Sequence, residues 1–205
     1  MILPDSDEAR ARAAGVIRSG GIVAFRTDTF YGLGADPFNR DAVRRLNELK
    51  GRDDKPILVV IGDYSQAARF IETEPGVFEI VSGRHWPGAL TIVIKARAEV
   101  PEELTAGTGT IGLRLPGDEA VRSFVSACGG ALTATSANLA GSPPARTAEE
   151  VERAFPRGID LIVDDGPAIA DKPSTVLDLS GPQPRVIREG VVPISDLDAA
   201  LGTTE

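Results

Sequence analysis

The feature that most constrains this chain is the alternation of short apolar runs with amphipathic stretches of helical length. The apolar runs are rich in β-branched residues and end at Gly, Pro or charged residues, which is typical of buried strands. We expect strands at 22–25, 57–61, 90–95, 111–115, 131–135, 161–164, 174–179 and 185–188. We expect helices at about 5–20, 39–50, 64–72, 76–85, 118–127 and 147–155. This order predicts an α/β fold with helices around one mixed, twisted sheet.

The charge and the composition argue against a disordered chain and against a general nucleic-acid binder. Hydrophobic residues make up 42% of the chain, enough for a sizeable core, which excludes a disordered chain. The net charge is −8, and residues 149–205 carry 5 basic against 12 acidic side chains. This balance argues against a general binder of nucleic acid, whose affinity depends on neutralising phosphates. Only ten aromatic residues are present, which argues against a stacking platform for single strands.

Cysteine and histidine are scarce, with Cys128 and His85 the single examples of each. One cysteine cannot form an intramolecular disulfide, so we expect a reducing compartment and a cytoplasmic location. One histidine and one cysteine also argue against a zinc or iron site and against a Ser-His or Cys-His catalytic pair. No run of 18 apolar residues predicts a membrane span, and the N-terminus does not resemble a secretory signal. The Walker, dinucleotide and G-x-S-x-G signatures are absent.

Two polar clusters follow expected strands. Thr27–Leu33 places hydroxyls and a carboxylate directly after strand 22–25, which fits a ligand rim in an α/β sheet. The same residues also fit a turn in which Thr and Asp bond to their own backbone. Thr133–Asn138 combines small side chains with Ser and Asn, which suits contacts to phosphate, ribose or a base edge. A Ser/Thr or Asx turn explains that cluster equally.

Several cations could bind anions. Lys50 and Arg52 flank a glycine at the expected end of a helix, with Lys55 just beyond. They can form a claw for phosphate oxygens or simply complement the helix dipole. Arg114 and Arg188 each lie within an expected strand, so each either faces solvent or points into a cleft where a carboxylate could bind.

The order of the motifs is more specific than any one of them. The set is Thr-Asp-Thr-x-Tyr-Gly-Leu from Thr27, Lys-Gly-Arg from Lys50, Trp-Pro-Gly-x-Leu-Thr from Trp86, Gly-Leu-Arg-x-Pro from Gly112, Thr-Ser-Ala-Asn from Thr135, Ser-Thr-Val-x-Asp from Ser174 and Arg-Glu-Gly from Arg188. Between about Gly21 and Val191 the chain thereby resembles the YrdC-like family of threonylcarbamoyl-AMP synthases. The Lys50/Arg52 and Ser136/Asn138 pairs are the most telling elements.

The resemblance implies a reaction and a fold. L-threonine, bicarbonate and ATP would give L-threonylcarbamoyladenylate and pyrophosphate, without a covalent protein nucleophile. Mg²⁺ would accompany ATP as the cofactor. The implied fold is one YrdC-like domain over residues 1–205, with a large concave face, a core at about 21–191 and an acidic C-terminal tail at 192–205. The chain is similar to the short, single-domain form found in bacteria.

The resemblance also implies the roles of individual residues. Lys50 and Arg52 would stabilise the developing charge. The residues expected to bind the nucleotide are Lys50, Arg52, Lys55, Thr110, Ser136, Asn138 and Arg188. The residues expected to bind threonine are Thr27, Arg114 and Ser174. No protein side chain is expected to bind a metal directly.

Three positions depart from the family pattern. Arg26 stands where the family usually has proline, so anion contacts could change or Arg26 could face outward. Val60 stands where the longer, two-domain relatives often have histidine, and Pro144 stands where many members have a serine near the nucleotide.

The resemblance implies partners as well. A downstream threonylcarbamoyl-transferase complex would pass the group to a tRNA adenosine beside the anticodon. This chain itself would bind tRNA or double-stranded RNA weakly at most and would not contact a membrane. The main alternative is a non-catalytic RNA-binding or ribosome-assembly factor that uses the same concave face. Two further alternatives are a carbamoyl-transferring maturation enzyme, against which the length argues, and a paralogue that has lost the site. The two motif pairs argue against the second.

Overall fold

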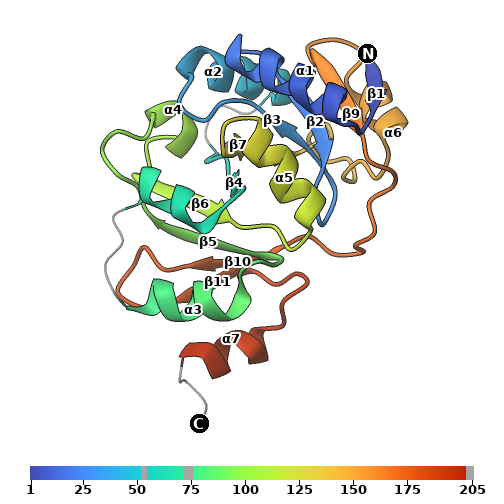
Figure 1. Cartoon of the computed structure of the whole chain (residues 1–205). Helices are drawn as coiled ribbons and strands as arrows, with labels where there is room; N and C mark the ends of the chain where they lie inside the picture. Colours follow the sequence, from blue (N-terminus) through green and yellow to red (C-terminus); the bar gives the residue numbers. More distant parts are fainter. Residues whose placement is uncertain (52–54, 72–75, 202–205) are drawn as a thin grey trace.

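The computed structural model describes residues 1–51, 55–71 and 76–201 (Figure 1). The strands are β1 (Ile2–Pro4), β2 (Val23–Arg26), β3 (Tyr31–Gly34), β4 (Val59–Ile61), β5 (Leu90–Lys95), β6 (Thr110–Arg114), β7 (Ala131–Thr133), β8 (Thr135–Ser136), β9 (Leu161–Asp164), β10 (Thr175–Asp178) and β11 (Arg185–Arg188). The helices are α1 (Asp7–Arg18), α2 (Arg40–Lys50), the 3₁₀ helix η1 (Tyr64–Arg69), α3 (Val77–His85), α4 (Glu102–Thr105), α5 (Glu119–Ala127), α6 (Ala148–Ala154) and α7 (Ile194–Leu201). None of the helices in these described ranges has the length and apolar character needed to cross a bilayer.

The strands form two mixed sheets. The five-stranded sheet has the order β1-β9-β2-β3-β8, with β1, β9 and β2 parallel and β3 antiparallel to both of its neighbours. The six-stranded sheet has the order β11-β10-β5-β6-β4-β7 and contains two parallel pairs, β10 with β5 and β6 with β4. The expected α/β class with mixed sheets is confirmed.

The structure has two sheets where one was expected, because the segment 131–135 is divided between them. Its first part, β7, pairs with β4, and its second part, β8, pairs with β3. Between them the Ala134 amide donates to the carbonyl of Leu58 at 2.8 Å, while the Thr133 amide donates to Ala35 at 3.0 Å. The chain therefore passes from one sheet to the other at Ala134. Buried residues of both sheets, such as Leu33 and Ile92, share one hydrophobic core.

Local capping residues fix where helices α1 and α2 begin. Ser6 caps α1 by accepting from the Ala9 amide, and Asn39 caps α2 by accepting from the Ala42 amide. Helix α2 buries Val43 and Leu46 and ends at Gly51, whose φ of 58° is left-handed and therefore suits glycine. This end fixes where the side chain of Lys50 lies.

The end of the chain differs from the expected acidic tail. Residues Ile194–Leu201 form helix α7, which packs against α3 beyond β10 and β11 (Figure 1). Leu197 is fully buried, because the spacing of Ile194, Leu197 and Leu201 puts apolar side chains on one face. The segment therefore adds to the core rather than extending from it.

Candidate functional site

The residues Thr27–Phe30 form the turn of a hairpin between β2 and β3. Thr27 is buried, and its hydroxyl donates to the Phe30 carbonyl at 2.7 Å and lies 3.2 Å from the donating Thr29 amide. This is the local backbone bonding that the turn interpretation predicts. The turn nevertheless lies at the end of a buried strand, as a ligand rim would.

Arg114 ends β6 and points toward this turn from the other sheet. Its Nη2 lies 3.1 Å from Asp28 Oδ1, and its Nη1 donates to the Thr29 hydroxyl at 3.4 Å. The side chain of Arg114 is only 3% exposed. Of the two alternatives left open by the sequence, solvent exposure is therefore excluded for Arg114. A buried arginine requires anionic partners, and Asp28 is one.

Arg188 and Ser174 lie beside Arg114. The Arg188 guanidinium donates to the Ser174 carbonyl at 2.9 Å, and the Ser174 hydroxyl is 2.9 Å from that of Thr91. Burial and the positive charge of Arg114 lower the pKa of Arg188. The structure thus joins Arg188, which is exposed at the end of β11, to Ser174, a residue expected to bind threonine. The nucleotide role that the resemblance implies for Arg188 remains a prediction.

A second group gathers around Lys50. The Lys50 Nζ donates to the Ser136 carbonyl at 2.6 Å, to the Asn138 carbonyl and to Asn138 Oδ1 at 3.3 Å. The Ser136 hydroxyl donates to Asn138 Oδ1 at 2.6 Å. Two motifs more than 80 residues apart in sequence therefore meet in space. In this structure the ammonium of Lys50 is bound to the backbone of the second motif.

The two groups adjoin each other across β3. Gly32 of β3 pairs with Ser136 of β8, only two residues after the hairpin turn. A Cβ built at Gly32 would lie 3.5 Å from the Thr135 carbonyl and 3.6 Å from the Thr27 methyl. These are ordinary van der Waals distances, so the turn and the Ser136 segment both lie next to Gly32.

The remaining expected residues are less closely associated. Thr110 begins β6, at the opposite end of the strand from Arg114, and its hydroxyl lies 2.9 Å from that of Thr108. Lys55 is exposed just before β4. Arg52 lies outside the described residues. The roles of all three remain predictions.

The loop after Asn138 is tied to both groups. Asn138 Nδ2 donates to the Ser142 carbonyl at 2.5 Å, and the Tyr31 amide donates to the Ala145 carbonyl at 3.1 Å. Pro144, the departure from the family pattern, lies half-buried in this loop. Because it has no hydroxyl, its side chain offers no hydrogen bond to a nucleotide.

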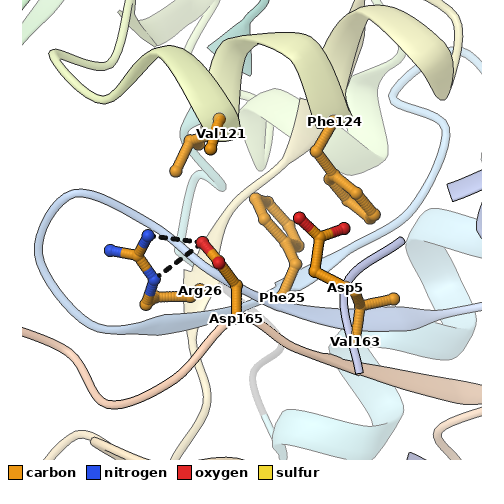
Figure 2. A pocket seen from close by; sticks show the side chains of 8 residues that line it. Asp5, Phe25, Arg26, Val121, Phe124, Val163 and Asp165 are labelled. Atoms are coloured by element: carbon orange, nitrogen blue, oxygen red, sulfur yellow. Dashed lines mark hydrogen bonds and ion pairs between the residues drawn. The ribbon is translucent and has the colours of Figure 1, made fainter. Parts of the chain in front are cut away.

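Arg26 does not face outward. Its Nε donates to Asp165 at 3.0 Å (Figure 2). Its Nη2 donates to Asp118, also at 3.0 Å. Burial alone would lower the pKa of Arg26, but the hydrogen bond and charge of Asp165 raise it. The adjoining cavity, between Phe25 and Phe124, has room for about one water molecule. Arg26 therefore ties β2 to the cap of α5 and the end of β9. Val60, the third departure, is fully buried in the core beneath α5.

Sequence reasoning included Asp28 and Thr29 in the first polar cluster but gave them no individual role, and it missed Thr91. Asp28 and Thr29 belong to the first motif, and Thr91 follows Trp86-Pro87-Gly88 in the third, so the motif order contained the signal. Among the described residues, no group of three or more His, Cys, Asp or Glu side chains could hold a metal ion.

Comparisons with known proteins show the family to which the chain belongs. The family model Sua5_yciO_yrdC, described as "Telomere recombination", matches residues 15–190. A threonylcarbamoyl-AMP synthase of Pyrococcus abyssi is 35% identical over 191 residues, which cover 93% of this chain and 56% of the relative. One of Idiomarina loihiensis is 38% identical over 162 residues, which cover 77% of this chain and 86% of the relative.

Solved structures give the same result. The crystal structure of P. abyssi Sua5 complexed with L-threonine matches with a TM-score of 0.91 and 33% identity, covering 98% of this chain and 60% of that one. The crystal structure of E. coli YciO matches with a TM-score of 0.82 and 27% identity, covering 95% of each chain. This chain spans less than three fifths of the P. abyssi and Bacillus subtilis synthases. Since the family model covers most of its length, the chain belongs to the Sua5/YciO/YrdC family.

Proposed function

We propose that this chain is an L-threonylcarbamoyladenylate synthase that uses L-threonine, bicarbonate and ATP. The observation that carries the proposal is the contact of Lys50 with Ser136 and Asn138, near a second group that contains Thr27, Arg114 and Ser174. Relatives named threonylcarbamoyl-AMP synthase, and a Sua5 structure complexed with L-threonine, support it.

The proposed reaction balances in two steps. The neutral amine of threonine attacks the carbon of carbon dioxide, which forms from bicarbonate by loss of hydroxide, and the released proton neutralises that hydroxide to water. A carbamate oxygen then attacks the α-phosphorus of ATP, and the bond to the departing pyrophosphate breaks. Both reactants are anionic, so the task of the protein is to position them and to offset their charge.

Each of the two groups of residues would bind a different substrate. Arg114, with Arg188 and Ser174 beside it, would bind the threonine carboxylate, because a guanidinium can hold a carboxylate through two parallel hydrogen bonds. Lys50 and Arg52 would stabilise the charge on the phosphates, and Ser136 and Asn138 would bind phosphate or ribose. Thr27 would contact the threonine side chain. Lys55 and Thr110 remain weaker candidates for the nucleotide.

Further parts of the proposal concern the setting of the reaction. Mg²⁺ would bind to the phosphate oxygens of ATP and enter the site with the nucleotide. The product would go to a threonylcarbamoyl-transferase complex acting on tRNA, in the cytoplasm. The alternative of a non-catalytic RNA-binding factor is disfavoured by the net charge of −8.

The test is the release of pyrophosphate from ATP. We expect release that requires both L-threonine and bicarbonate. Equal release without threonine would overturn the proposal and leave a generic nucleotide-hydrolysing site. No release under any condition, together with RNA binding, would favour the alternative.

A further inference from the structure

A buried carboxylate joins the two sheets inside the candidate site. Asp28 lies in the hairpin turn of the five-stranded sheet, and Arg114 ends β6 of the six-stranded sheet. Asp28 Oδ1 is 3.1 Å from Arg114 Nη2, and Asp28 Oδ2 accepts from the Gly117 amide at 3.1 Å. The carboxylate is 11% exposed. One side chain therefore holds both the guanidinium at the end of β6 and the backbone that follows it.

The hydrogen bonds around this pair are incomplete. Within the described parts of the chain, Arg114 Nε has no hydrogen-bond partner although it is buried. Asp28 Oδ1 also lacks a well-directed hydrogen bond, so its contact with Arg114 is an ion pair only. Buried polar atoms without partners are costly and need an explanation, and a ligand that completes them is one. The spare donor of Arg114 suits an anionic group.

The local charge explains why a carboxylate is needed. The pKa of Arg188 is lowered first by burial and second by the positive charge of Arg114, as expected when two guanidinium groups repel each other. Asp28 offsets this repulsion at Arg114. Without Asp28, Arg114 would lose its ion-pair partner while remaining buried, and its orientation would no longer be fixed.

We propose that Asp28 is a positioning residue for the amino-acid substrate: it fixes the guanidinium of Arg114 so that the spare donor can bind the substrate carboxylate. The inference rests on the proposed function and extends it to a residue that does not itself react. Asp28 is the carboxylate paired with Arg114, whereas Asp118 and Asp165 are paired with Arg26.

The first test is the Asp28→Asn variant. Asparagine has the same size and can still accept from the Gly117 amide, but it lacks the charge. We expect the KM for L-threonine and for L-serine to rise by about tenfold or more, because both share the carboxylate, while the KM for ATP stays within about twofold. Asp165→Asn, which removes an equivalent charge from Arg26, is the matched control and should leave both KM values within about twofold.

The outcomes separate the inference from the proposed function. If the wild type releases pyrophosphate with threonine but Asp28→Asn leaves its threonine KM unchanged, the inference fails and the function stands. An equal rise in the ATP KM would also overturn the inference, since it would indicate a general loss of structure. If Asp28→Asn does not fold, Asp28→Glu replaces it, with the same expected split between the two KM values.

A second measurement does not depend on activity. In ¹H–¹⁵N spectra of arginine Nε–H groups, the signal lost in Arg114→Lys identifies Arg114. We expect this signal to shift and to exchange faster with water in Asp28→Asn, but not in Asp165→Asn. An unchanged signal would show that Asp28 does not hold the guanidinium. This result holds even if the wild type proves inactive toward threonine.

Discussion

Replacing Lys50 with methionine tests the contact that joins the two motifs. Methionine keeps most of the apolar length of the side chain and removes the ammonium. That ammonium donates to the Ser136 carbonyl at 2.6 Å and to Asn138 Oδ1 at 3.3 Å, from a side chain whose residue is only 7% exposed. The variant therefore leaves the acceptors of the Ser136–Asn138 segment without their cation.

The structure sets the size of the expected effect. A hydrogen bond to a charged group contributes about 1.5–3 kcal/mol, and a cation in the last turn of a helix adds about 0.3–1 kcal/mol. Ser136 is exposed, so water can replace part of the loss. We expect a cost of about 3 kcal/mol in the free energy of unfolding. For a domain of this size, that cost lowers Tm by roughly 6–12 °C.

Thermal unfolding followed by circular dichroism measures this difference. Lys55→Met is the matched control, since Lys55 is exposed, and we expect its free energy of unfolding to change by no more than about 0.5 kcal/mol. Lys50→Met should also lose pyrophosphate release. If Lys50→Met melts within about 2 °C of the wild type, Lys50 does not hold the second motif, and the reasoning from its contacts is wrong.

Three further predictions concern other parts of the chain. Arg52→Ala should lower the rate of pyrophosphate release by roughly 10²–10³-fold without a change in Tm. The control Arg12→Ala, on the exposed face of α1, should leave the rate unchanged, and equal rates in the two variants would refute the role of Arg52. Gly190→Ala should lower stability by about 1–3 kcal/mol, because the new Cβ would lie 2.1 Å from the Pro173 carbonyl; an unchanged Tm would count against this packing. Burial raises the pKa of the Cys128 thiol to about 12, so the native protein should react with a thiol reagent at pH 8 far more slowly than the unfolded protein; equal rates would contradict its burial.

Much of the fold could be predicted because its signals are local. Ser6 and Asn39 cap helices that form within the expected ranges 5–20 and 39–50, and the strand expected at 90–95 forms with those bounds. Strand β3 was missed because Tyr31–Gly34 contains two glycines, and its strand character depends on pairing with β2 and β8. The division into two sheets at Ala134 was missed because it depends on contacts with residues about 75–100 positions away.

The site shows the same limit. The motif order identified Lys50, Ser136 and Asn138, but only the structure shows that the ammonium of Lys50 binds the backbone of the second motif. Likewise, nothing local in the sequence could place Arg188 beside Ser174 and Arg114, because that placement depends on the pairing of β10 with β5 and β11. The sequence thus named residues that the structure brings close together, but it did not predict which of them would be neighbours.

The most direct test of the central claim is the identity of the product. The purified chain would be incubated with ATP, L-threonine and ¹³C-labelled bicarbonate, and the nucleotides analysed by mass spectrometry. We expect an adenylate that carries both threonine and one labelled carbon, and that is absent when either threonine or bicarbonate is omitted. An adenylate of threonine without the labelled carbon, or AMP alone in every mixture, would contradict it.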